Sequence, residues 1–217
     1  MSSNCFIVYD DETRRAVVID PGSEKSEKEI SFLANNHLRL DYILLTHEHT
    51  DHNWGVNALK EAYPDTKLVC SELCDQLVKK TNRTFFSFYY DDPNYVYVID
   101  SADILIKSND DVLPWDGKNI RFMITPGHSK ASMCIDIEGR LFTGDTIMPY
   151  PRYLNRKDGN EEEWRNSVRI ILSQYGAETE VFPGHGECLL LKEWNIESNI
   201  KLFKRTKVIG GLPMVNI

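Results

Sequence analysis

The pattern of apolar and polar positions predicts a chain in which strands and helices alternate. Short apolar runs bounded by polar or turn residues predict strands at residues 5–9, 16–19, 42–45, 67–69, 104–106, 120–124, 133–137, 141–143 and 180–182. Apolar residues that recur every three or four positions predict amphipathic helices at residues 26–37, 56–63, 72–80, 161–173 and 190–204. Strands that lead into helices in both halves favour a layered α/β fold with helices outside. The chain shows no repeat and no Gly/Ser linker, so we expect one domain over residues 1–217, with a short C-terminal helix from about residue 190.

One segment, Phe85–Tyr97, is unusually aromatic and also acidic. Aromatic clusters serve cores and dimer contacts as readily as binding sites, so two interpretations stay open. The segment either packs in a core or interface, or it forms a rim that holds an apolar part of a substrate.

Composition and charge narrow the choice of partner. The chain has 217 residues, of which 41% are hydrophobic, enough to bury a substantial core. Its net charge of −8 disfavours binding to a phosphate backbone, and its best basic cluster is typical of the solvated face of a terminal helix. That cluster is Lys201, Lys204, Arg205 and Lys207. The apolar runs are far too short to cross a bilayer. We therefore expect a small-molecule substrate, no nucleic acid, no membrane, and a monomer or homodimer.

Five scattered cysteines indicate a reducing compartment: Cys5, Cys70, Cys74, Cys134 and Cys188. An odd, dispersed set suits reduced thiols better than a disulfide framework. Cys70 and Cys74 could form half of a metal site, but no second cysteine pair completes it. The first residues lack the basic and apolar stretches of a secretory signal. The sequence therefore predicts a cytoplasmic protein.

The strongest chemical signal follows the predicted strand 42–45. There, four candidate metal ligands, His47, His49, Asp51 and His52, fall within six residues. Such a set cannot point one way from a strand or a helix, but it can converge from a loop that wraps around an ion. Imidazole nitrogens and carboxylate oxygens suit zinc, iron or manganese.

Three further candidates arrive singly, each directly after a glycine: His128, Asp145 and His185. A glycine before the ligand lets the backbone turn tightly and approach an ion. A lone histidine beside a glycine is usually only a loop residue, but four such motifs in one chain are rarely a coincidence. His37 lies at a predicted helix end, matches no motif and is expected at the surface.

The order His-x-His-x-Asp-His, Gly-His, Gly-Asp and Gly-His resembles the pattern of the metallo-β-lactamase superfamily, and the early Asp20-Pro21-Gly22 matches its first motif. The likeness runs from about Cys5 to His185. It implies a four-layer αβ/βα sandwich with the metals at one edge between the two sheets. It also implies that His47, His49 and His128 hold one metal, that Asp51, His52 and His185 hold the second, and that Asp145 bridges both. Asp20 would orient the ligand loop without being a ligand.

Within the superfamily, several branches fit poorly. The common β-lactamases lack a bridging aspartate at the position of Asp145, flavodiiron proteins carry Glu at that of His49, and quorum-quenching lactonases carry Tyr at that of Met148. The nuclease branch adds basic surfaces, which this acidic chain does not offer. Glyoxalase II and its relatives are the most similar in motifs. However, they carry Tyr where this chain has Glu187, and a longer C-terminal region that binds glutathione.

The resemblance therefore implies a binuclear metal-dependent hydrolase that attacks a thioester, ester or related carbonyl. Its cofactors would be two divalent ions, zinc in preference to iron or manganese, with Asp51 and Asp145 as the catalytic carboxylates. Two alternatives stay open. One is an oxidoreductase with a single iron, similar to persulfide dioxygenases, and the other is a catalytically idle metal-binding module.

Overall fold

The computed structural model describes residues 3–79, 97–150, 159–198, 207–209 and 212–214. Of the aromatic segment, only Tyr97 lies within these residues, so both interpretations of that segment stay predictions. Lys201, Lys204 and Arg205 of the basic cluster also lie outside them. Among the described residues, no helix is both long enough and apolar enough to span a membrane.

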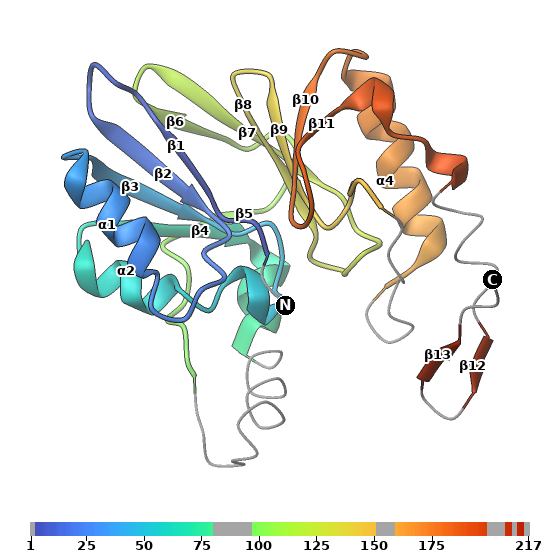
Figure 1. Cartoon of the computed structure of the whole chain (residues 1–217), viewed down its shortest axis with the longest axis horizontal. Coiled ribbons are helices and arrows are strands. Elements are labelled where there is room, and N and C mark those ends of the chain that lie inside the picture. The colour runs from blue at the N-terminus through green and yellow to red at the C-terminus, as the bar shows by residue number, and fades with distance from the viewer. Residues whose placement is uncertain (1–2, 80–96, 151–158, 199–206, 210–211, 215–217) are drawn as a thin grey trace.

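Two β-sheets form the centre of the structure (Figure 1). The first has the strand order β1-β2-β3-β4-β5. Its strands are β1 (Phe6–Tyr9), β2 (Arg15–Ile19), β3 (Arg39–Leu44), β4 (Lys67–Ser71) and β5 (Ile104–Ile106). β1 and β2 form an antiparallel hairpin, and β2 to β5 run parallel to one another.

The second sheet has the order β11-β10-β9-β8-β7-β6. Its strands are β6 (Val112–Trp115), β7 (Lys118–Ile124), β8 (Met133–Ile137), β9 (Arg140–Gly144), β10 (Glu180–Pro183) and β11 (Leu189–Leu190). Neighbours are antiparallel except β9 and β10, which are parallel. β7 and β9 therefore run in the same direction as β10. Farther along the chain, β12 (Lys207–Ile209) pairs with β13 (Leu212–Met214).

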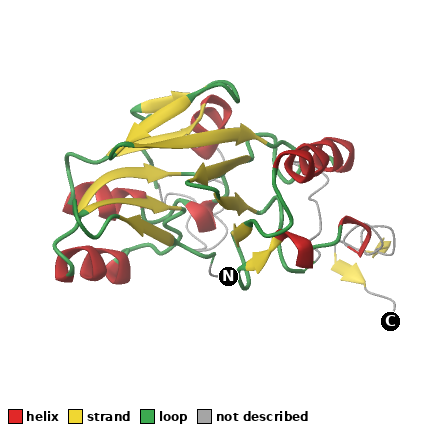
Figure 2. Ribbon diagram, turned by 90° about the horizontal axis from the view of Figure 1, so that it is seen from above, coloured by secondary structure: helices red, strands yellow, loops and turns green. Residues whose placement is uncertain are grey.

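Helices cover the outer face of each sheet. α1 (Glu27–Asn35), α2 (Val56–Ala62) and a helix at residues 72–79 lie against the first sheet, and α4 (Glu161–Gln174) lies against the second (Figure 1). Seen from above, the strands occupy the middle of the molecule and most helices lie at its outer sides (Figure 2). The layers therefore follow the order helices, sheet, sheet, helix, which is the αβ/βα sandwich that the resemblance implied.

Alternation along β2 shows why the chain forms these layers. Because successive side chains of a strand point to opposite faces, Ala16 and Val18 pack under the helices while Val17 and Ile19 pack against the second sheet. All four side chains are fully buried. A parallel strand covered on both faces needs such a continuous apolar run, which β2 has in its last four residues and β3 in its last three. Removing these residues from water is the main favourable term that holds the layers together.

Most predicted elements are present, with two differences. The strand Val112–Trp115 was not predicted, although Asp116-Gly117, with φ angles of 51° and 72°, is a strong signal for the tight turn that joins it to β7. The predicted helix 190–204 is wrong at its start. β11, a short 3₁₀ turn (Leu191–Glu193) and Trp194-Asn195 occupy residues 189–195, and helical backbone begins only at residue 196.

The C-terminal basic residue Lys207 lies in β12 and therefore not on a terminal helix. That the whole chain forms a single domain stays a prediction.

Candidate metal centre

All seven candidate ligands lie in loops at the carboxyl ends of strands, one strand in the first sheet and three strands of like direction in the second. His47, His49, Asp51 and His52 follow β3, with the last two in a 3₁₀ turn (Thr50–His52). The other three, His128, Asp145 and His185, follow β7, β9 and β10. The carboxyl ends of strands in α/β sheets are the usual place for ligand sites. The structure brings all seven residues together there.

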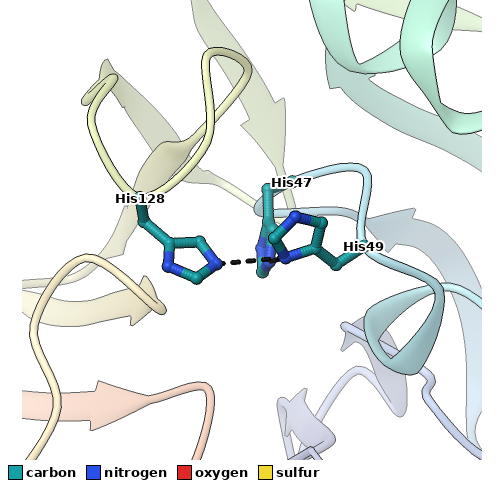
Figure 3. A group of neighbouring side chains, drawn as sticks. All are labelled: His47, His49 and His128. Atoms are coloured by element: carbon teal, nitrogen blue, oxygen red, sulfur yellow. Dashed lines mark hydrogen bonds between the residues drawn. The ribbon is translucent and has the colours of Figure 1, made fainter. Parts of the chain in front are cut away.

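The first cluster, called here the three-histidine group, comprises His47, His49 and His128 (Figure 3). His47 Nε2 lies 3.0 Å from His49 Nδ1, and His128 Nε2 lies 3.1 Å from the same nitrogen. His47 and His128 are buried, and His49 is partly exposed. Three imidazole nitrogens from two distant parts of the chain thus face one point.

The second cluster, called here the aspartate group, comprises Asp51, His52 and His185. Asp51 Oδ2 lies 3.3 Å from His185 Nε2 and 4.0 Å from His52 Nε2. His52 is fully buried, whereas the side chain of Asp51 is 27% exposed. Each group thus has two buried members and one partly exposed member, His49 in the first and Asp51 in the second.

Asp145 lies between the two groups. Its Oδ2 is 3.4 Å from His128 Nε2 in the three-histidine group. Its Oδ1 is 3.5 Å from His52 Nε2 and 3.6 Å from His185 Nε2 in the aspartate group. The two oxygens of one buried carboxylate thus face two different sets of nitrogens.

Asp20 and Thr46 fix the orientation of two of these rings. Asp20 Oδ2 accepts hydrogen bonds from Thr46 Oγ1 at 2.6 Å and from His52 Nδ1 at 3.0 Å, while Oδ1 accepts the Thr46 N–H at 2.8 Å. Because the Thr46 hydroxyl donates its only proton to a carboxylate, it must accept from His47 Nδ1, 3.0 Å away. Both rings therefore carry a proton on Nδ1 and turn Nε2 toward the cluster. Such outer contacts typically set the tautomer of metal-binding histidines.

Burial and neighbouring charges shift the protonation of the site in the absence of an ion. Burial, followed by the other histidines around it, lowers the pKa of His47 well below its ordinary value. For His52, burial opposes the charged ring, but the Asp20 carboxylate outweighs it and raises the pKa to about 9. Burial alone would raise the pKa of Asp51, but His185 and His52 reverse this and hold it below its ordinary value. Asp51 is therefore a carboxylate at neutral pH.

Two glycines permit the close approach of the ligand loops. Gly144 has a φ of 50°, in the left-handed region that favours glycine, and its Cα faces Thr46. A methyl group at Gly184 would overlap Asp145 Oδ1 and the ring of His52. These positions explain why a glycine precedes Asp145 and His185 in the sequence.

The donor set fits a metal ion. Ligand nitrogens around a tetrahedral zinc lie about 3.3 Å apart, given Zn–N distances of about 2.0–2.1 Å. The observed separations of 3.0 and 3.1 Å are close to this value. A single proton on His49 Nδ1 cannot serve both neighbouring nitrogens, whereas a cation can accept all three lone pairs. His52 Nε2 is buried and makes no hydrogen bond within the described part of the chain, and a cation could bind it together with the nearby carboxylates of Asp51 and Asp145.

The structure also shows supporting residues to which sequence reasoning gave no role. Glu48 is buried and accepts a hydrogen bond from Ser129 Oγ at 2.7 Å, which ties the loop of His47 and His49 to that of His128. On α4, Trp164 donates to Thr146 O at 2.8 Å and Ser167 donates to Pro126 O at 2.7 Å. These contacts cross the fold, and a sequence carries no local signal for them, apart from the positions of Glu48 and Ser129 beside ligands.

A family model described as the metallo-beta-lactamase superfamily matches residues 1–185. The chain belongs to the metallo-β-lactamase superfamily. Both the resemblance noted in the sequence and the fold class that it implied are confirmed. Among solved structures, BLEG-1, a B3 metallo-beta-lactamase, is similar with a TM-score of 0.75 and 24% identity, over 88% of this chain and 90% of that one. At that identity the likeness shows the fold alone.

Two curated relatives within the superfamily are informative. The probable polyketide biosynthesis zinc-dependent hydrolase PksB of Bacillus subtilis is 29% identical over 83% of this chain and 72% of its own length. The atrochrysone carboxyl ACP thioesterase of Aspergillus fumigatus is 27% identical over 99% of this chain and 60% of its own length. This chain is similar to both, and it spans about three fifths of the thioesterase.

Proposed function

We propose that this metallo-β-lactamase superfamily protein is a hydrolase that holds two divalent ions and cleaves a thioester or ester. The placement of Asp145 carries the proposal, because its two oxygens face two separate sets of histidine nitrogens. A carboxylate in that position can share its charge between two cations. The likeness to PksB, a probable zinc-dependent hydrolase, favours zinc over iron or manganese.

Each group would then hold one ion. His47, His49 and His128 would bind the first through the nitrogens that already face one another, and Asp51, His52 and His185 would bind the second. Asp145 would contact both. Asp20 contacts Thr46 and His52, and its carboxylate is occupied by these hydrogen bonds, so it would orient ligands without being one.

The chain's own residues define how the reaction would proceed. When bound, the two ions would lower the pKa of water to about 7 and polarise the substrate carbonyl. Asp51 is ionised and only partly buried, so it can accept a hydrogen bond from the attacking water and orient it. Asp145 keeps the negative charge between the two groups. The thiol released from a thioester has a pKa of about 8.5, so the thiolate can leave without a strong general acid.

The substrate is proposed to be a thioester without negative charges close to the scissile bond. The likeness to a thioesterase supports the bond type. Glu187 lies two residues beyond His185 and is exposed, and it would repel the glycine carboxylate of glutathione. That the protein acts in the cytoplasm on small molecules, as a monomer or homodimer, stays a prediction.

A combined measurement of metal content and substrate range tests this proposal. We expect close to two zinc ions per chain, and hydrolysis of thioesters in a panel that also contains lactones, phosphodiesters and persulfides. One iron per chain with oxygen uptake on a persulfide would show the dioxygenase-like chemistry instead. Bound metal without turnover on any member would favour the idle module.

A further inference from the structure

The N-terminal segment joins the two loops that carry the aspartate group. Asn4 Nδ2 donates hydrogen bonds to Pro183 O at 2.9 Å and to Gly186 O at 2.7 Å. The backbone N–H of Asn4 donates to Gly184 O at 2.7 Å. One residue thus holds the main chain on both sides of His185, about 180 positions away in the sequence.

Its neighbour Ser3 reaches the other loop of the same group. Ser3 Oγ donates a hydrogen bond to the carbonyl oxygen of Asp51. Gly22 lies against the same carbonyl, with no room for a side chain. Residues 3 and 4 therefore form a strap between the Asp51 loop and the His185 loop, whereas a hydrogen bond between Glu48 and Ser129 connects the loops of the three-histidine group.

Packing alone does not fix the strap. Ser3 and Asn4 line a surface cavity of about 810 Å³, together with residues of the α1 region and Gly186, Glu187 and Cys188. Both side chains are only partly buried. Because one side of the strap faces open space, its position depends on these hydrogen bonds.

We propose that Asn4 is a positioning residue for His185 and so controls the affinity of the aspartate group for its ion. This inference rests on the proposed function, since it requires that the aspartate group binds metal. Loss of the Asn4 amide would let the 183–186 loop move while the three-histidine group keeps its geometry. Outer contacts of this kind typically change metal affinity by about 10–100-fold.

The test is a titration of metal-free protein with Zn²⁺ in competition with a chromophoric chelator, which gives two dissociation constants without any measurement of activity. The variants are Asn4→Ala and His185→Ala, and the latter identifies the step that belongs to the aspartate group. Asn36→Ala is the matched control, because Asn36 also donates its amide to a backbone carbonyl, Phe32 O at 2.8 Å, but at the end of α1.

We expect Asn4→Ala to raise the dissociation constant of the aspartate-group step by about tenfold or more, and to change the other step less than twofold. Asn36→Ala should leave both steps unchanged. Equal weakening of both steps, or no change in either, would overturn the inference. If Asn4→Ala does not fold, Asn4→Ser and Asn4→Asp replace it in the same titration. Ser keeps a hydrogen-bond donor and Asp removes it, so Asn4→Asp should weaken the aspartate-group step more than Asn4→Ser does. If the wild-type chain binds fewer than two ions, the proposed function fails first.

Discussion

The two ligand groups differ in how the chain builds them. The three-histidine group uses three imidazoles, of which His47 and His128 are buried, and a buried hydrogen bond between Glu48 and Ser129 connects its two loops. The aspartate group contains the partly exposed carboxylate of Asp51, and its two loops are joined by the N-terminal strap. Asp145 faces both groups.

The two groups also differ in the type of ligand atom that they offer to an ion. The three-histidine group offers nitrogen ligands alone. The aspartate group adds a carboxylate oxygen, from an Asp51 side chain that is 27% exposed. Carboxylate oxygen is also the harder ligand, so manganese should compete with zinc better in the aspartate group than in the three-histidine group.

The largest effect is expected where the two groups meet. Asp145→Asn removes the charge that both ions would share and should lower kcat/KM by about three orders of magnitude or more, with loss of metal. His49→Ala, which removes a ligand from the three-histidine group alone, should also abolish turnover. The measurements are metal content, circular dichroism and hydrolysis. His37→Ala is the control, because His37 is exposed and outside both groups. Full activity in either site variant would remove the assignment.

Gly184→Ala should act nearly as strongly, but through space alone. Its methyl group would overlap Asp145 Oδ1 and His52, forcing the His185 loop away. Overpacking of this kind costs about 1–3 kcal/mol, so thermal stability should fall together with metal content. Gly176→Ala provides the matched control, since Gly176 has open space around it. Wild-type metal content in Gly184→Ala would show that the loop can relax without loss of the site.

Ser129→Ala sharpens the comparison from the other side. The buried Glu48 carboxylate would lose the hydroxyl that donates to it, so the link between the loops of His47 and His128 would weaken. We expect about a tenfold loss in affinity in the three-histidine step and little change in the other, the reverse of Asn4→Ala. Zinc titration measures both steps, with Ser173→Ala, an exposed serine of α4, as the control. Similar results for Ser129→Ala and Asn4→Ala would mean that the two groups are not independently supported.

The smallest effect concerns substrate charge beside the aspartate group. A substrate carboxylate near that of Glu187 would lose on the order of 1 kcal/mol of binding free energy at a partly exposed site, which weakens binding several-fold. S-lactoylglutathione should therefore have a higher KM than a neutral thioester of similar size, and Glu187→Tyr should lower it. The comparison of kcat/KM at low salt decides the matter. A strong preference of the wild-type protein for the glutathione ester would place it with ordinary glyoxalase II relatives.

The candidate ligands are visible in the sequence because their chemistry is local. Four donors in six residues after a predicted strand, and single donors after glycines, are visible without any tertiary structure. Asn4 was not visible, because its partners are backbone carbonyls that every residue carries, and only the fold brings them near. The role of Glu48 was hidden for the same reason, although it stands inside the most conspicuous motif of the chain.

The differences in the fold have a similar cause. Leu191 and Trp194 occur at a spacing that fits a helix, but the preceding residues pair with β10 as β11, and both side chains pack against the second sheet and α4. Tertiary contacts thus override the local pattern. For Val112–Trp115, a proline in the run obscured a strand at the edge of the sheet, where proline is tolerated.

The most direct test of the central claim is a stepwise reconstitution. Zinc is added to chelator-stripped protein while hydrolysis of a neutral thioester is followed alongside bound metal. If Asp145 joins two ions into one reactive centre, activity should appear mainly as the second equivalent binds, and Asp145→Asn should show no activity at any equivalent. Full activity at one equivalent, with no further change at the second, would contradict the binuclear account.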